Sequence, residues 1–356
     1  MMKKRQNNIE VLRVLCMFLI VVSHYVYHGL KQGTTAHLLG LYPLQVGTRL
    51  SFWDYSLMEV FYLISRVSVD CYVMITGYFL ISRQTFRWKG LFGVWFQTFF
   101  YAVVIGLVFF SLGKLSSLER VLPYFTPIRS NAYWFITTYV GLLLLAPFVS
   151  KIAVSLSKRN YQYLLLIVFV MNFQPLFGVC YSNRIFQFVT LFLVGGYFQI
   201  YGIFNIWKRN SKIVYTIVLM SLYILATIYN WLRNTNGWEL KSSEFNDIIV
   251  FLALATFVLF LSLECKSRIC EVIVKLSPYT LGVYLIHDND LIRSCLWEIA
   301  LGNKNNMPMF LHCLLVSLLI FFICVFVDFM RSKIFKYFKI NKYIDFISKK
   351  VPEVKV

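Results

Sequence analysis

Long apolar stretches alternate with short polar segments along the chain, and this alternation predicts helices that cross a membrane. A spanning helix needs about 20 mostly apolar residues, and in lipid its backbone must satisfy its own hydrogen bonds. The predicted fold is therefore all-α. The apolar runs predict ten transmembrane helices, near residues 9–29, 57–81, 91–112, 132–150, 161–177, 185–203, 213–232, 247–263, 277–298 and 309–330.

The basic residues between these runs predict the orientation of the chain. Cytoplasmic loops hold most of the Lys and Arg of a polytopic membrane protein. On the ten-helix topology, 23 basic residues fall on one side and nine on the other, with three arginines inside helices. Both termini are therefore expected in the cytoplasm. Residues 331–356 form a basic cytoplasmic tail that we expect to lie against anionic lipid.

Composition agrees with a membrane protein and excludes other classes. The 356 residues are 59% apolar and 14% charged, with a mean hydropathy of +0.66, which a soluble globular domain does not reach. The net charge of +19 is spread between the apolar runs, whereas a nucleic-acid-binding protein gathers its charge on one surface. The sequence shows no repeat and no separable soluble domain, so residues 1–356 are expected to form a single transmembrane domain.

Ionisable residues inside the predicted helices are the strongest functional signal. Such groups are costly in lipid unless they face the bundle interior or a wet cavity. Arg13 and His24 are eleven residues apart on the first helix, close to three full turns, so they share a face. Arg66 and Asp70 stand four residues apart on the second helix and can pair. His287 lies in the ninth helix.

Structural roles remain alternatives for these groups. Arg13 can extend to the interface and fix the orientation of the helix, and His24 can hydrogen-bond across helices for packing. Arg66 and Asp70 can form a structural ion pair. Three residues nearer the outer interface are interpreted as solvated: His28, Asp290 and Arg293.

Several chemistries find no support in the sequence. There is no phosphate-binding loop, no dinucleotide glycine pattern and no HExxH motif. Five histidines without a sequence cluster, and eight cysteines without a CxxC pair, argue against a metal site. The carboxylates are too sparse for a paired-acid glycosidase.

Four segments together resemble one known family. In chain order they are NNIEVLRVLCMFLIVVSHY, SRVSVDCYVMITGYFLI, NAYWFITTYVGLLLLAPF and LSPYTLGVYLIH. They are similar to the acyltransferase 3 family of bacterial membrane proteins, which acylate surface glycans. The first segment matches an arginine and histidine pair, and the second an arginine before a Thr-Gly-Tyr turn at Thr76, Gly77 and Tyr78. The third matches aromatic positions that include Trp134 and Tyr139.

The resemblance implies transfer of an acetyl group from cytoplasmic acetyl-CoA to a hydroxyl of a surface glycan or lipid-linked sugar, in the inner membrane of a bacterium. This chemistry needs a base for the hydroxyl, cations for the CoA phosphates and donors for the thioester oxyanion. We assign His24 as the base, with His287 as the second candidate; a transient acetyl-histidine is an allowed variant. Arg66, oriented by Asp70, is the expected oxyanion donor.

Arg13 is expected to bind a CoA phosphate, and the resemblance adds Tyr78, Trp134 and Tyr139 as residues that bind the donor. A rise of 1.5 Å per residue places His24 and Arg66 at about 22 Å from the cytoplasmic side, and His287 at about 15 Å. The alternatives from other classes are a flippase or polymerase of lipid-linked glycans and a small-molecule transporter. Neither would depend on acetyl-CoA.

Overall fold

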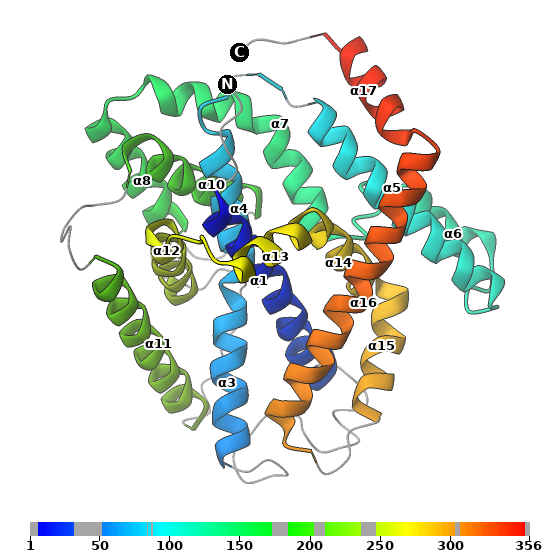
Figure 1. Ribbon diagram of the computed structural model, residues 1–356, viewed down its shortest axis with the longest axis horizontal. Coiled ribbons are helices and arrows are strands. Elements are labelled where there is room, and N and C mark those ends of the chain that lie inside the picture. Colours follow the sequence, from blue (N-terminus) through cyan, green and yellow to red (C-terminus); the bar gives the residue numbers. More distant parts are fainter. Residues whose placement is uncertain are drawn as a thin grey trace. The chain divides into compact units, whose positions relative to one another are not determined.

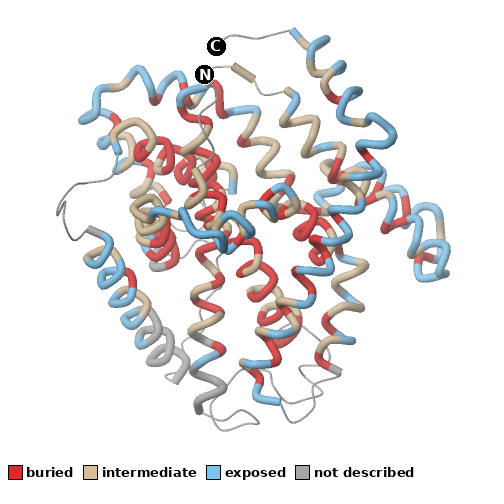
Figure 2. The backbone as a smooth tube through the Cα atoms, in the orientation of Figure 1, coloured by how far each residue is buried: buried red, intermediate tan, exposed pale blue. Residues whose placement is uncertain are grey.

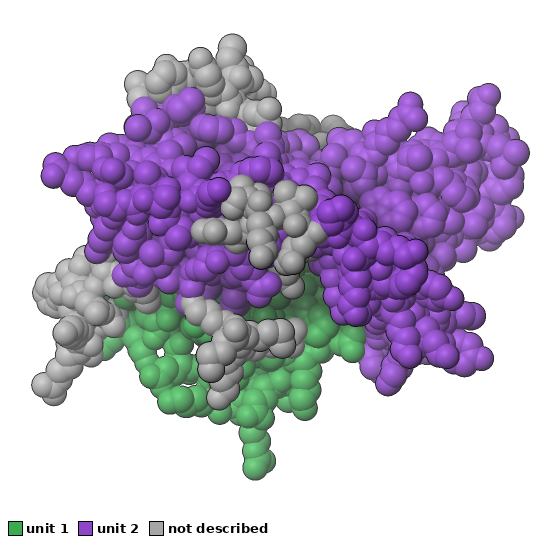
Figure 3. Space-filling view, turned by 90° about the horizontal axis from the view of Figure 1, so that it is seen from above, with its two compact units in different colours: residues 1–72, 203–326 green, residues 73–202, 327–356 purple. Residues whose placement is uncertain are grey.

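A computed structural model describes residues 6–31, 52–83, 85–86, 88–172, 184–202, 211–235, 247–302 and 307–352. The chain forms two compact units (Figure 3). Unit 1 holds residues 1–72 and 203–326, and unit 2 holds residues 73–202 and 327–356. Two helices run from one unit into the other, α4 (Ser68–Leu80) and α16 (Met309–Tyr337).

Unit 1 is built around its first helix. Ten of the 18 residues of α1 (Asn7–His24) are buried (Figure 2). The amides of Asn7 and Asn8 donate to backbone carbonyls of Cys265 and Phe260, which ties the start of α1 to the end of α12. The other helices of this unit are a π-helix η1 (Tyr25–Lys31), α3 (Phe52–Arg66), α11 (Ser211–Thr235), α12 (Asp247–Ser262), α13 (Arg268–Leu276), the 3₁₀ turn η3 (Ser277–Tyr279), α14 (Thr280–His287) and α15 (Asp290–Gly302) (Figure 1).

Unit 2 packs its helices around α5 and α10. Within it, α10 lies against α7 and α8, and α5 lies against α6, α7 and α17. The helices that belong wholly to this unit are α5 (Trp88–Ser111), α6 (Leu118–Phe125), α7 (Trp134–Ser155), α8 (Lys158–Asn172), α10 (Arg184–Tyr201) and α17 (Ile340–Lys350) (Figure 1).

The prediction of an all-α membrane fold is confirmed for the described residues. Every expected apolar run falls on a helix, and the described part contains no β-sheet. Six helical spans are long and apolar enough to cross a membrane: Asn7–Leu30, Val60–Leu80, Trp88–Ser111, Trp134–Ser155, Arg268–His287 and Met309–Tyr337. Shorter apolar helices lie at Lys212–Leu225 and Ile249–Ser262. The count of ten and the cytoplasmic placement of both termini stay predictions.

One of the expected helices is broken, and another has a single irregular residue within a continuous span. The run at 57–81 passes from α3 to α4 at Val67, and the run at 277–298 is divided between α14 and α15. Hydropathy averaged over a whole span does not locate either position, because Val67 lies among the polar residues Ser65, Arg66 and Ser68 and the apolar pattern resumes after residue 290. Both positions lie next to ionisable residues.

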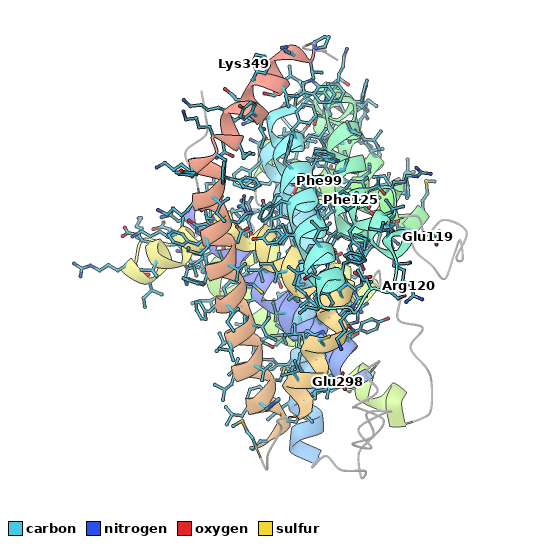
Figure 4. The ribbon with its side chains drawn as sticks, turned by 90° about the vertical axis from the view of Figure 1, so that its right-hand side faces the viewer. Phe99, Glu119, Arg120, Phe125, Glu298 and Lys349 are labelled. Carbon is cyan, nitrogen blue, oxygen red and sulfur yellow. The ribbon has the colours of Figure 1, made fainter. Side chains whose placement is uncertain are left out.

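Three helices with one polar side were not predicted, because their apolar residues occupy only one face. They are α6, α13 and α17. Glu119 and Arg120 project from α6, and Lys349 lies near the end of α17 (Figure 4). Lys89 at the start of α5 pairs with Asp345 of α17 at 2.8 Å and holds the pKa of that carboxyl below its usual range.

Unit 2 also contains a buried polar cluster around Asp328 of α16. Its carboxylate is fully buried and accepts hydrogen bonds from Gln97 (2.9 Å) and Tyr101 (2.8 Å) of α5. The Arg331 guanidinium pairs with both carboxylate oxygens, at 2.7 and 3.1 Å. A buried charge is tolerated when it is paired and hydrogen-bonded in this way.

We expect Asp328→Asn to lower the free energy of unfolding by about 2 kcal/mol, because Arg331 loses its counter-charge while the acceptor for α5 is kept. Unfolding in mixed micelles of increasing dodecyl sulfate content measures this loss. Combining Asp328→Asn with Arg331→Met should recover part of it. A single variant as stable as the wild type would contradict the assignment of this pair as a structural clamp.

Candidate active site

The break between α14 and α15 follows from three successive turn-forming residues. Asp288, Asn289 and Asp290 interrupt the apolar run TLGVYLI, and short polar side chains of this kind favour caps and turns over helix interiors. The Asn289 side chain accepts the backbone N–H of Leu291 at 3.1 Å, so it caps α15. The break leaves His287 as the last residue of α14 and Asp288 in the connection.

A second irregularity faces this break from the first helix. His24 is the last α-helical residue of α1, and from Tyr25 the chain continues as the π-helix η1, which carries His28. Short π-helical turns occur frequently at functional sites. Unit 1 packs η1 against α15 and α1 against α14.

The two helix ends bring His24 and His287 into direct contact. Nδ1 of His24 lies 2.9 Å from Nε2 of His287. His287 is fully buried, and its own Nδ1 lies 2.6 Å from the backbone oxygen of Val283. The His24 side chain is 17% exposed, so it is the partner that keeps access to a reactant.

The hydrogen-bond partners define where the protons lie in the neutral pair. A carbonyl oxygen only accepts, so Nδ1 of His287 must carry a hydrogen, and its Nε2 then has a lone pair. His24 must therefore donate through Nδ1–H. The remaining lone pair of His24 is on Nε2, which leaves that atom able to take a proton from a substrate.

Asp288 connects the histidines to a cation. Its Oδ1 lies 3.5 Å from Nδ1 of His24 and 3.6 Å from Nε2 of His28. Arg293, one turn into α15, donates to the same oxygen at 3.1 Å. The carboxylate is nearly fully buried, and Arg293 supplies the charge that compensates it.

Ligand atoms of His24, His28 and Asp288 lie within 4.8 Å of one another, a spacing that a metal ion can bridge. Two contacts oppose a metal here. Nδ1 of His24 carries the proton shared with His287, and Arg293 already pairs with Oδ1 of Asp288. A cation bound through these two atoms would have to displace both contacts.

Comparison with known families decides between the remaining classes. A model of the acyltransferase domain of the acyltransferase 3 family matches residues 6–328, which includes α1, α14 and the His24–His287 pair. The chain belongs to the acyltransferase 3 family. No curated protein and no solved structure matches it. It is thus a membrane acyltransferase, and the expectation drawn from the four sequence segments is confirmed at this level.

Within this acyltransferase, the expected depths of His24 and His287 stay predictions. The sequence placed His287 about 7 Å nearer the cytoplasm than His24, counting 1.5 Å per residue from Ser277. The structure places the two rings in contact. The helical span that holds His287 begins at Arg268, nine residues earlier than expected.

The interpretation of His28 as solvated is wrong, whereas Arg293, whose side chain is 34% exposed, is partly solvated. The histidines also cluster in space, contrary to the expectation. The His28 side chain is 16% exposed and its ring lies edge-on to that of His24, with centroids 5.0 Å apart. Asp288, to which the sequence assigned no role, is the residue that connects them. The sequence signal for the break was the polar run Asp288-Asn289-Asp290 directly after LIH, because a continuous membrane helix would not contain three such residues in succession.

Arg66 and Asp70 lie on either side of Val67. Arg66 ends α3, and its guanidinium donates to the Tyr62 hydroxyl at 3.1 Å and lies 5.6 Å from that ring. Asp70 is in the first turn of α4 and is buried. The orientation of Arg66 by Asp70 stays a prediction.

The residues expected to bind the donor fall into both units. Arg13 of α1 pairs with the buried Glu10 at 3.1 Å, so its guanidinium is already oriented by a carboxylate. The other three belong to unit 2: Tyr139 lies 3.3 Å from the Thr76 hydroxyl, Tyr78 lies inside α4 and not in a turn, and Trp134 lies under the Arg184 guanidinium at 4.4 Å.

Proposed function

We propose that this acyltransferase moves an acetyl group from cytoplasmic acetyl-CoA to a hydroxyl of a cell-surface glycan or its lipid-linked precursor, in the inner membrane of a bacterium. Membership of the family supports acyl transfer, and the basic-residue asymmetry supports a donor that approaches from the cytoplasm. The observation that carries the proposal is the hydrogen bond from His24 to His287, because it leaves a basic nitrogen on a partly exposed ring.

In this proposal His24 acts as the general base. Its Nε2 takes the proton of the acceptor hydroxyl while the hydroxyl oxygen attacks the thioester carbonyl carbon. The C–O ester bond forms, the C–S bond breaks, and the proton passes to the departing thiolate to give free CoA. Positioned proton transfer of this kind accelerates a reaction by about 10²- to 10⁴-fold.

The neighbours of His24 supply orientation and charge compensation. His287 accepts the Nδ1–H and fixes the tautomer, and Asp288 lies where its carboxylate can pair with the imidazolium that forms. Arg13 is the proposed ligand of a CoA phosphate, held in place by Glu10. Arg66 is the proposed donor to the thioester oxyanion, with Asp70 proposed to orient it.

The test uses the purified full-length protein in lipid nanodiscs. Release of free CoA from acetyl-CoA is followed with a thiol reagent, with and without purified capsule, lipopolysaccharide or peptidoglycan, and transfer of labelled acetyl to the glycan is counted in parallel. We expect glycan-dependent release of CoA. A flippase, polymerase or transporter would release no CoA and label no glycan, and that outcome would contradict the proposal.

A further inference from the structure

A second buried pair of titratable side chains lies directly beside His24. The Tyr25 hydroxyl is 2.6 Å from Nδ1 of His312, which belongs to α16. Tyr25 is fully buried and His312 nearly so. The mechanism above uses neither residue.

The surroundings of Tyr25 hold it firmly between two helices. Its ring packs edge-on against Trp297 of α15, with centroids 5.9 Å apart, and its hydroxyl also lies 3.3 Å from the Met309 sulfur at the start of α16. An imidazole nitrogen is a stronger acceptor than a thioether sulfur, so the hydroxyl proton goes to His312. The short O···N distance agrees with this assignment.

Tyr25 is also the residue at which the helix changes from α to π. A π-helical turn is a strained, short-lived form in isolation and persists where its surroundings fix it. Tyr25 is the side chain through which the first π residue contacts α15 and α16. Those contacts therefore fix the orientation of the π-helical turn. This orientation sets the position of His24 at the end of α1 and of His28 beside Asp288.

We propose that Tyr25 and His312 form a positioning pair that holds the π-helical turn and thereby directs Nδ1–H of His24 at His287. The inference rests on the proposed function of His24 as the base. Tyr25 and His312 act through His24 and need not touch either substrate. Removing the hydroxyl releases the turn and lets the His24 ring occupy orientations in which Nδ1–H no longer meets Nε2 of His287.

The kinetic test is Tyr25→Phe, which keeps the buried ring and removes only the oxygen atom. We expect kcat to fall about 10-fold, since a small misplacement of a reacting group has an effect of that size or larger. KM for acetyl-CoA should change less than about twofold, because donor binding is not altered. His312→Phe should have the same effect, and the double variant should lose no more than either single one.

Tyr161→Phe is the matched control. Tyr161 is equally buried and donates to the Leu193 carbonyl at 2.8 Å, but it lies in unit 2, outside the histidine cluster. The Tyr161→Phe substitution removes the equivalent hydroxyl oxygen and, with it, one buried hydrogen bond. Its kcat should remain at the wild-type level. An equal fall in kcat for both variants would show general loosening of the fold and would overturn the positioning role.

A spectroscopic measurement tests the pair without any acyl donor. In protein labelled with ¹⁵N-histidine, with His24 assigned by comparison with His24→Asn, the wild type should show the Nδ1–H tautomer and Tyr25→Phe a mixture of tautomers. If the wild type transfers no acyl group, the proposed function fails, whereas this measurement still tests the pair. An unchanged His24 tautomer in Tyr25→Phe would overturn the inference.

Discussion

Replacement of His24 by asparagine is expected to lower kcat for acetyl transfer by about 10³-fold, the middle of the range for loss of a general base. The asparagine amide nitrogen occupies the place of Nδ1, so it can still donate to His287 across the 2.9 Å contact. What it lacks is the second nitrogen, on which the structure leaves the lone pair. The variant therefore removes the base and retains the packing.

Glycan-dependent release of CoA and transfer of labelled acetyl measure this effect, and equal melting temperatures for wild type and variant establish that the fold is intact. KM for acetyl-CoA should stay within about twofold, because the base acts in the chemical step. A kcat within a few-fold of the wild type would exclude His24 as the base and make His287 the next candidate. His287 is less suited, since both its nitrogens are engaged.

Burial of the histidine cluster costs little free energy because its charges compensate one another. Asp288 and Arg293 form an ion pair at 3.1 Å, and the hydrogen-bond assignment leaves His24 and His287 neutral before reaction. An uncompensated charge at this depth would cost several kcal/mol. In the proposed mechanism, proton transfer to His24 adds one positive charge beside the Asp288 carboxylate. That carboxylate compensates the charge of the imidazolium.

The sequence predicted the helices because lipid imposes a simple requirement on length and polarity. Every apolar run of the described chain is helical, since no other element satisfies its own backbone in hydrocarbon. The amphipathic helices α6, α13 and α17 were missed for the same reason, because hydropathy alone does not detect a helix with one polar face. The irregularity at Val67 lies among Ser65, Arg66 and Ser68, and hydropathy averaged over the span does not locate it.

The candidate site was predicted in part. His24 and His287 were selected because ionisable residues in apolar runs are costly, and both belong to the cluster. Their contact could not be predicted, because it depends on how α1 and α14 pack and on the early start of the span at Arg268. The roles of Asp288 and His28 likewise require the broken helix and the π-helical turn, which hydrophobic periodicity does not encode.

Close contact between α4 and α10 in unit 2 gives the largest expected effect on stability. A Cβ atom added at Gly77 would overlap the backbone carbonyl of Phe192, and one added at Gly195 would overlap that of Met74. Small residues let membrane helices approach until their backbones touch. Backbone atoms cannot move aside as a flexible side chain can, so either substitution must push the helices apart.

Gly77→Ala and Gly195→Ala are each expected to lower the free energy of unfolding by about 3 kcal/mol or more, because overpacking against backbone has no local relief. At Gly196 the atoms nearest to an added Cβ belong to the Ile81 side chain and not to backbone, so Gly196→Ala should be milder. Gly93 of α5 has nothing within 4 Å of an added Cβ, so Gly93→Ala should be neutral or stabilise by up to about 1 kcal/mol through helix propensity. Unfolding in mixed micelles and the yield of monodisperse protein rank the four variants. Equal stability of Gly77→Ala and Gly93→Ala would contradict the close approach of α4 and α10.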